Sequence, residues 1–133
     1  MRAVDTNVLV RLAVGDEPRE EAAARVFVQA GAWVSHLVLV EATWVLSSVY
    51  DLGPAEIASA VEVLLKHQHL TLQDAEVVEG ALALFRERPA LGFSDCLVLE
   101  VARRAGHVPL GTFDRGLAQV EGAERITQRP GRS

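Results

Sequence analysis

Residues 1–12, MRAVDTNVLVRL, form an apolar run in which Asp5 is the only acid and is followed at once by Thr6 and Asn7. The short apolar piece before Asp5 is expected to be a strand, so Asp5 stands where the first strand passes into the first helix. An aspartate in that place can cap the helix by accepting backbone N–H groups. It can also lie at the edge of a sheet where open α/β proteins bind ligands. The stretch therefore leaves two roles open for Asp5.

Apolar spacing along the rest of the chain predicts an alternation of helices and strands. Helices are expected near 17–29, 37–50, 55–66, 74–87 and 94–105. Short apolar pieces, expected to be strands covered on both faces, lie at 3–4, 32–34, 70–72, 108–110 and 125–126. This alternation favours an α/β fold with a largely parallel sheet over a helical bundle.

Length and composition narrow the class of protein. The chain has 133 residues, 50% of them hydrophobic, so we expect one domain over 1–126 and a flexible basic tail over 127–133. The single cysteine, Cys96, excludes a disulfide framework within one chain and favours a reducing, cytoplasmic setting. No apolar run approaches the roughly 20 residues that span a bilayer, so no membrane partner is expected.

The charge balance limits how the chain can bind nucleic acid. Thirteen basic and eighteen acidic residues give a formal net charge of -5, which argues against a general nucleic-acid coat held by phosphate contacts alone. Divalent cations gathered by several acids would invert the local field, however, and would let a polyanion bind there. Charge therefore leaves a metal-dependent site open.

Three further acids draw attention. Asp95 stands near the start of FSDCLVLEVA (93–102), where the helix expected over 94–105 begins, and Asp114 follows VPLGTF (108–113); each alone is typical of an acid at a helix start. The helical neighbours of Glu41 are Leu37, Val38, Trp44 and Val45. We expect that face to be buried, where a glutamate needs a cation, a hydrogen-bond donor or a wet cavity. A salt bridge to an arginine is the alternative for Glu41.

Taken together, the acids favour a metal site. In an open parallel sheet the strand-to-helix turns emerge at one edge, where Asp5, Glu41, Asp95 and Asp114 can converge. Four unpaired carboxylates in one crevice would repel one another strongly. Hard divalent cations with oxygen ligands, magnesium or manganese, are the simplest way to hold them together.

Four blocks of the sequence resemble the PIN-domain family, specifically the VapC-type toxin of VapBC toxin–antitoxin pairs. They are VDTNVLVRLAVGDEP (4–18), LVLVEATWVLSSVY (37–50), FSDCLVLEVARRAG (93–106) and LGTFDRGLAQV (110–120). The resemblance implies a three-layer α/β/α fold with a central, mainly parallel five-stranded sheet. It also implies a magnesium-dependent endoribonuclease that cuts single-stranded RNA by metal-activated water.

The resemblance implies roles for individual residues. The catalytic and metal-binding quartet would be Asp5, Glu41, Asp95 and Asp114, with Asp5 and Asp95 as direct ligands of one or two Mg²⁺ ions, for which Mn²⁺ would substitute. Thr6, Asn7 and Thr112 match polar positions beside these acids, where they either hold a carboxylate in place or form cap and turn hydrogen bonds. Gly116 stands where some relatives carry a further acid, so a second ion is expected to bind weakly.

The family also implies a homodimer that a cognate antitoxin inhibits. The stretch 37–50 is apolar over more of its circumference than one contact needs, which suggests that a partner covers part of it. We therefore expect Trp44 and Val45, together with the helix 17–29, to form an antitoxin groove.

Two other functional classes compete with the nuclease. One is a partner-binding module without catalysis, which would use the same apolar stretch. The other is a magnesium-dependent phosphatase that forms an aspartyl-phosphate. Such enzymes generally need an acid two residues after the nucleophile, where this chain has Asn7, and a catalytic lysine, whereas Lys66 is the only lysine here.

Overall fold

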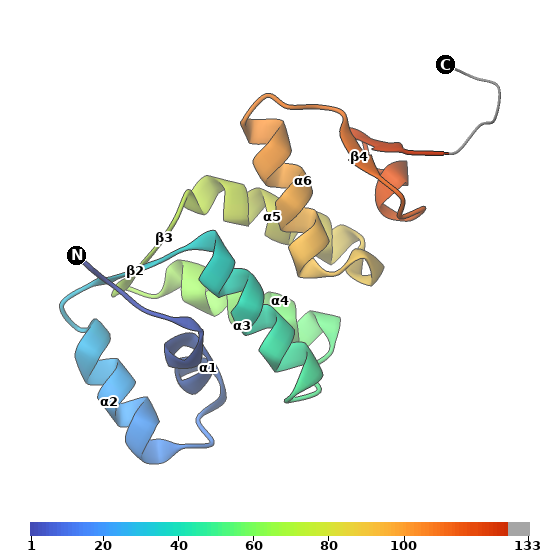
Figure 1. Ribbon diagram of the computed structural model, residues 1–133. Coiled ribbons are helices and arrows are strands. Elements are labelled where there is room, and N and C mark those ends of the chain that lie inside the picture. Colours follow the sequence, from blue (N-terminus) through green and yellow to red (C-terminus); the bar gives the residue numbers. More distant parts are fainter. Residues whose placement is uncertain (128–133) are drawn as a thin grey trace.

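The computed structural model describes residues 1–127, which form an α/β fold (Figure 1). Its helices are α1 (Thr6–Val14), α2 (Pro18–Val28), α3 (His36–Ser48), α4 (Pro54–Lys66), α5 (Ala75–Glu87) and α6 (Phe93–Arg104). The strands are β1 (Arg2–Ala3), β2 (Ala32–Val34), β3 (Leu70–Leu72), β4 (Leu110–Thr112) and β5 (Ala123–Arg125), and the short 3-10 turns are η1 (Pro89–Leu91) and η2 (Leu117–Gln119). The five helices expected from apolar spacing are confirmed to within two residues at each end. From residue 128 on, the expected tail lies outside the described residues.

The strands are all parallel, as predicted, but they form two sheets rather than one. β2 pairs with β1 on one side and with β3 on the other, while β4 pairs only with β5. Figure 1 shows β4 beyond α6, away from β1–β3. The prediction of one central five-stranded sheet is therefore wrong for this structure, although the α/β class is confirmed. The strands have only two or three residues, so a ladder between β1 and β4 would add few hydrogen bonds.

The last two strands are displaced by about two residues from the expected positions. β4 begins at Leu110 rather than Val108 because Pro109 has no N–H to donate to a ladder. The first donor of this pair is the Leu110 N–H, which bonds the Gly122 carbonyl at 2.8 Å. β5 is displaced in the opposite direction and begins at Ala123, two residues earlier than expected; it pairs with β4 so that Gly111 lies opposite Glu124.

The helix starts that follow the first two strands are capped by side chains. Asp5 precedes α1 and accepts the Val8 N–H at 3.4 Å, and Ser35 precedes α3 and accepts the Val38 N–H at 3.1 Å. Both helices therefore begin directly at the carboxyl ends of β1 and β2. This arrangement places the start of α1 against α3, and Glu41 within the second turn of α3.

Two clusters of buried side chains hold the fold together. The larger cluster joins Val4, β2 and β3 to all six helices, and its most deeply buried members include Leu9, Leu39 and Val61. The smaller cluster, Leu99, Leu117 and Val120, attaches η2 and the β4–β5 pair to α6. Burying each such side chain contributes about 1.5–3 kcal/mol. Asp114 is thus held close to α6. None of the described helices combines the length and hydropathy that crossing a membrane would require.

Candidate active site

The first two acids of the predicted quartet come together at the junction of α1 and α3. Thr6 Oγ1 donates a hydrogen bond of 2.8 Å to Glu41 Oε2, and Asp5 is the residue directly before Thr6. Asp5 and Glu41 are both exposed to solvent. Of the two roles left open for Thr6, the structure shows the one in which its hydroxyl holds a carboxylate. Asn7 lies beside it, exposed, in the first turn of α1.

Glu41 does not lie on a buried face, so that prediction is wrong. Leu37 and Trp44, one turn before and after it, are 70% and 66% exposed. The core instead takes the opposite side of α3, through Leu39, Ala42, Thr43 and Leu46. Because α3 is apolar on nearly all sides, its sequence did not indicate which side faces the core. Among the salt bridges of residues 1–127, none involves Glu41, so the alternative of a bridge to an arginine is not found either.

The other two acids come together at the start of α6. Asp95 is half-buried in the first turn of this helix. Its pKa is raised, first by burial and then by the negative charge of Asp114 nearby. Asp114 Oδ1 accepts the Leu117 N–H at 2.9 Å, and Thr112 Oγ1 accepts the Asp114 N–H at 3.0 Å. Asp114 therefore fixes the turn into η2, and Thr112 serves as a turn residue.

Gly116 lies close to this second pair. A Cβ atom at this position would lie 3.3 Å from Asp114 Oδ1 and 3.4 Å from Leu91 Cδ2. An acidic side chain in place of Gly116 would therefore press directly on the Asp114 carboxylate.

The four acids are not gathered into one cluster. Among residues 1–127, no group of three or more histidine, cysteine, aspartate or glutamate side chains is arranged so that it could hold a metal ion. As placed here, the four acids therefore do not fit a metal site, because Asp5 and Glu41 stay with β1 and α3 whereas Asp95 and Asp114 stay with α6 and β4. The cap role of Asp5 and Asp114 is present in the structure beside any further role.

Two other reactive side chains are unsuited to catalysis. Burial, followed by the charge of Asp95, raises the pKa of Cys96 to about 11, so this thiol stays protonated and weakly nucleophilic at neutral pH. Arg11 is bound by Glu20 at 2.5 Å, by the Tyr50 hydroxyl at 3.1 Å and by Asp16 at 3.5 Å. Its Nε and Nη1 atoms are thus engaged within the fold.

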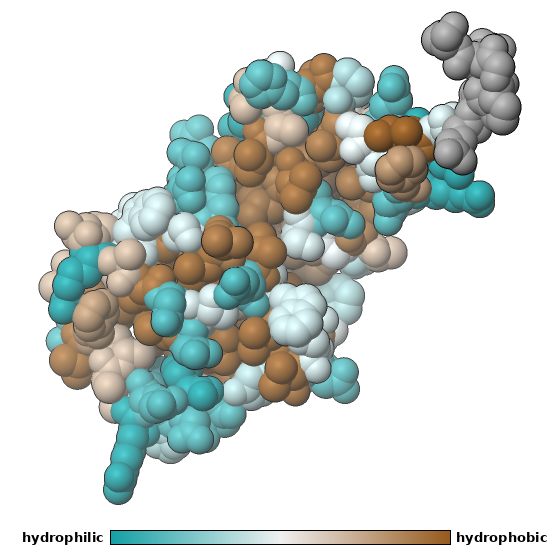
Figure 2. Space-filling view, in the orientation of Figure 1, coloured by the Kyte–Doolittle hydropathy of each residue, from teal (hydrophilic) through white to brown (hydrophobic). Residues whose placement is uncertain are grey.

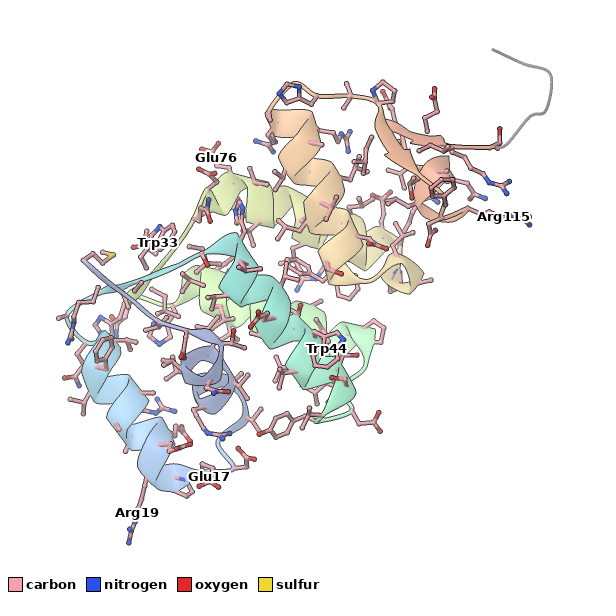
Figure 3. The ribbon with its side chains drawn as sticks, in the orientation of Figure 1. Glu17, Arg19, Trp33, Trp44, Glu76 and Arg115 are labelled. Atoms are coloured by element: carbon pink, nitrogen blue, oxygen red, sulfur yellow. The ribbon has the colours of Figure 1, made fainter. Side chains whose placement is uncertain are left out.

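A cleft opens beside Glu41, with a volume of about 480 Å³. It is lined by the exposed side of α3, including Glu41 and Trp44, and by residues 89–94, which end one residue before Asp95. Figure 3 shows Trp44 at the surface of α3. The sequence did not lead us to predict that residues 89–94 line the cleft. The feature that indicates them is the pair of turn residues Pro89 and Gly92 between two helices.

The antitoxin groove expected from Trp44, Val45 and the helix 17–29 does not form in that way. α1 contacts both α2 and α3 and lies between them (Figure 1). Val45 is half-buried against the main core, whereas Trp44 faces the cleft with residues 89–94. Figure 2 shows that apolar side chains gather on this face over α6 and the start of α3.

Comparison with known proteins identifies the family. The family model described as PIN domain matches residues 2–123. No curated protein and no solved structure gives a significant match to the chain. PIN domains are generally nuclease modules that use divalent metals and act on nucleic acids. With its match extending from β1 to the first residue of β5, the chain belongs to the PIN-domain family.

Proposed function

We propose that the protein is a magnesium-dependent endoribonuclease that cuts single-stranded RNA. The observation that carries this proposal is that two acids of this PIN domain, Asp5 and Asp114, take the same position relative to the strand before them. Asp5 lies two residues after the end of β1, and Asp114 lies two residues after the end of β4. Each acid has a second carboxylate close to it, Glu41 through Thr6 in the first case and Asp95 in the second.

The proposed activity requires these two pairs to share one site. β1 is paired only with β2, and β4 only with β5, so each strand keeps one unpaired edge. Neighbouring strands lie about 4.8 Å apart. A parallel pairing of β1 with β4, with Ala3 beside Thr112, would therefore bring Asp5 next to Asp114. We include this docking of β4 on β1 in the proposal as the step that assembles the acids.

Magnesium is the proposed cofactor because neighbouring carboxylates repel unless a hard cation offsets their charge. Manganese is expected to substitute, because it accepts the same oxygen ligands. One or two ions fit the proposal, and the second is expected to be the weaker because Gly116 supplies no carboxylate.

The proposal extends to the proteins that this chain binds. The chain would act as the toxin of a toxin–antitoxin pair, as a homodimer that a cognate antitoxin inhibits. Three large apolar side chains are exposed on the surface here: Leu37 on α3, and Val98 and Val101 on α6. Apolar surface of this kind is typical of protein interfaces and supports a covering partner.

The substrate class is tested with one sequence in three forms. The purified chain is incubated in magnesium with an end-labelled single-stranded RNA, with the same RNA annealed to its complement, and with DNA of the same sequence. Internal cuts confined to the single-stranded RNA are expected. A Glu79→Gln variant should cut like the wild type, because Glu79 is exposed on α5 and belongs to neither pair of acids. Equal cleavage of the DNA, or stepwise removal of terminal nucleotides, would contradict the proposal.

A further inference from the structure

The side chain of Trp44 is unusually placed for a large aromatic residue. It is 66% exposed, although the burial of an indole is normally favourable. Trp44 follows Glu41 by three residues on α3, and both line the cleft opposite residues 89–94. An aromatic wall thus stands beside an acid of the proposed site.

The charge of the cleft limits what can enter it. Among the described residues that line it, Glu41 is the only charged one, and no arginine, lysine or histidine is present. Without the proposed magnesium, a phosphate group would meet the negative charge of Glu41 and no positive side chain there. The cleft therefore suits an uncharged part of a substrate rather than its backbone.

The remaining lining residues define the shape of that uncharged part. Phe93 and Ile57 are buried and form an apolar floor, while the exposed hydroxyl groups of Ser47 and Ser94 stand at the rim. Such hydroxyl groups both donate and accept hydrogen bonds. A flat, mainly apolar group with polar edges matches this combination, and a volume of about 480 Å³ leaves room for it.

We infer that the cleft receives an unstacked nucleobase of single-stranded RNA, whose face lies on the indole of Trp44. This inference rests on the proposed ribonuclease function and names a residue that positions the substrate. Single-stranded nucleic acids are recognised in this way because every base has a π-face, and each stacked base contributes about 1–3 kcal/mol. The base next to the cleaved bond would lie beside Glu41, with its phosphate outside the cleft.

The two tryptophans of the chain make the inference directly measurable. Trp33 lies on β2, is 37% exposed and does not line the cleft, and Figure 3 shows it well apart from Trp44. In Trp33→Phe protein the tryptophan fluorescence therefore comes from Trp44 alone. In Trp44→Phe protein it comes from Trp33 alone, and a stacking ring is still present at position 44.

The probe is a single-stranded RNA hexamer in excess chelator, compared with the same hexamer carrying abasic sugars. We expect the RNA to quench Trp44 in the Trp33→Phe protein, the abasic form to leave it unquenched, and neither to quench Trp33 in the Trp44→Phe protein. Trp44→Ala should weaken RNA binding about tenfold, measured by anisotropy of labelled RNA, whereas Trp44→Phe should retain most of it.

Three outcomes would overturn the inference. RNA that binds or is cut while the Trp44 fluorescence stays unchanged would place the base elsewhere and leave the ribonuclease proposal intact. Quenching by an apolar helical peptide but not by RNA would make the cleft a peptide site. Wild-type protein that neither binds nor cuts RNA would remove the proposed function and this inference with it.

Discussion

The Thr6 hydroxyl donates a hydrogen bond of 2.8 Å to the Glu41 carboxylate, joining side chains 35 residues apart in the chain. Thr6 begins α1 directly after Asp5, and Glu41 lies in the second turn of α3, so this bond fixes two acids relative to each other. Neither residue is buried, and the bond adds little to stability in such a place. Its main effect is to orient a carboxylate of the proposed site.

Removing this hydroxyl should therefore lower activity more than stability. Thr6→Val keeps the size and branching of the side chain but leaves Glu41 without its donor. We expect RNA cleavage to fall about tenfold or more, as is typical when a group that orients a metal-site carboxylate is lost. The free energy of unfolding should change by less than about 1 kcal/mol. Thr6→Ser should restore most of the activity; equal activity in the valine and wild-type proteins would contradict this role.

Asp95 should make stability depend on pH. Its pKa is raised in the folded state by burial and by Asp114, so the folded chain binds a proton here more readily than the unfolded chain. The extra proton affinity of the folded state stabilises the fold in full below pH 3.8, the ordinary pKa of an aspartate. This stabilisation is lost as the pH rises through the raised pKa of the folded state. Asp95→Asn has no charge at any pH. In chelator at pH 7 we therefore expect Asp95→Asn to have the higher Tm.

The pH comparison separates this cause from a hydrogen-bonding role of Asp95. The difference in Tm between Asp95→Asn and wild type should shrink as the pH falls below about 4, because the wild-type carboxyl group is then neutral as well. Thermal unfolding of both proteins from about pH 3 to pH 8 measures it. A lower Tm for Asp95→Asn at pH 7 would show that the carboxylate stabilises the fold.

Gly80 should favour the close packing of α5 on α6. A Cβ atom there would lie 3.0 Å from Glu100 Cδ and closer still to Glu100 Oε2. Glu100 is only 7% exposed, and its carboxylate is held by Arg103 at 3.2 Å and Arg104 at 3.4 Å. Gly80→Ala should therefore cost about 1–3 kcal/mol of unfolding free energy, although the same change in an open helix normally stabilises by about 1 kcal/mol.

A double substitution identifies the cause of that loss. In a Glu100→Ala background the overlap is gone, so adding Gly80→Ala should be neutral or stabilising. Urea unfolding of the four proteins gives the coupling between the two positions. Gly80→Ala that stabilises the otherwise unchanged protein would contradict the overlap.

The docking of β4 on β1 should be detectable by cross-linking. The pair Ala3→Cys and Thr112→Cys would come within disulfide reach if the two strands pair, since bridged Cα atoms lie about 4.4–6.8 Å apart. The pair Ala3→Cys and Glu124→Cys is the control, because β5 would lie one strand further away. We expect mild oxidation to form the first bridge and not the second. Buried Cys96 should not compete. Equal cross-linking of both pairs would contradict ordered docking.

The features that could be predicted from the sequence are those that depend on residues close together in the chain. The bounds of α3 and the cap at Asp5 follow from local patterns, and the structure confirms both. The exposure of Glu41 was not predictable in this way, because α3 is apolar all round and the core alone decides which side is buried. The attachment of β4 to α6 depends on Leu99, Leu117 and Val120, distant residues whose packing no short pattern reveals. The Thr6–Glu41 bond is long-range for the same reason.

The most direct test of the central claim is metal-dependent cleavage with one acid removed from each pair. Wild type, Asp5→Asn and Asp114→Asn proteins are incubated with an unstructured RNA in magnesium, in manganese and in excess chelator. The account predicts internal cleavage by the wild type with either metal, no cleavage in chelator, and a loss of at least about 100-fold in both variants, because acids from separate sheets serve one site. Cleavage in chelator, or full activity in either variant, would contradict it.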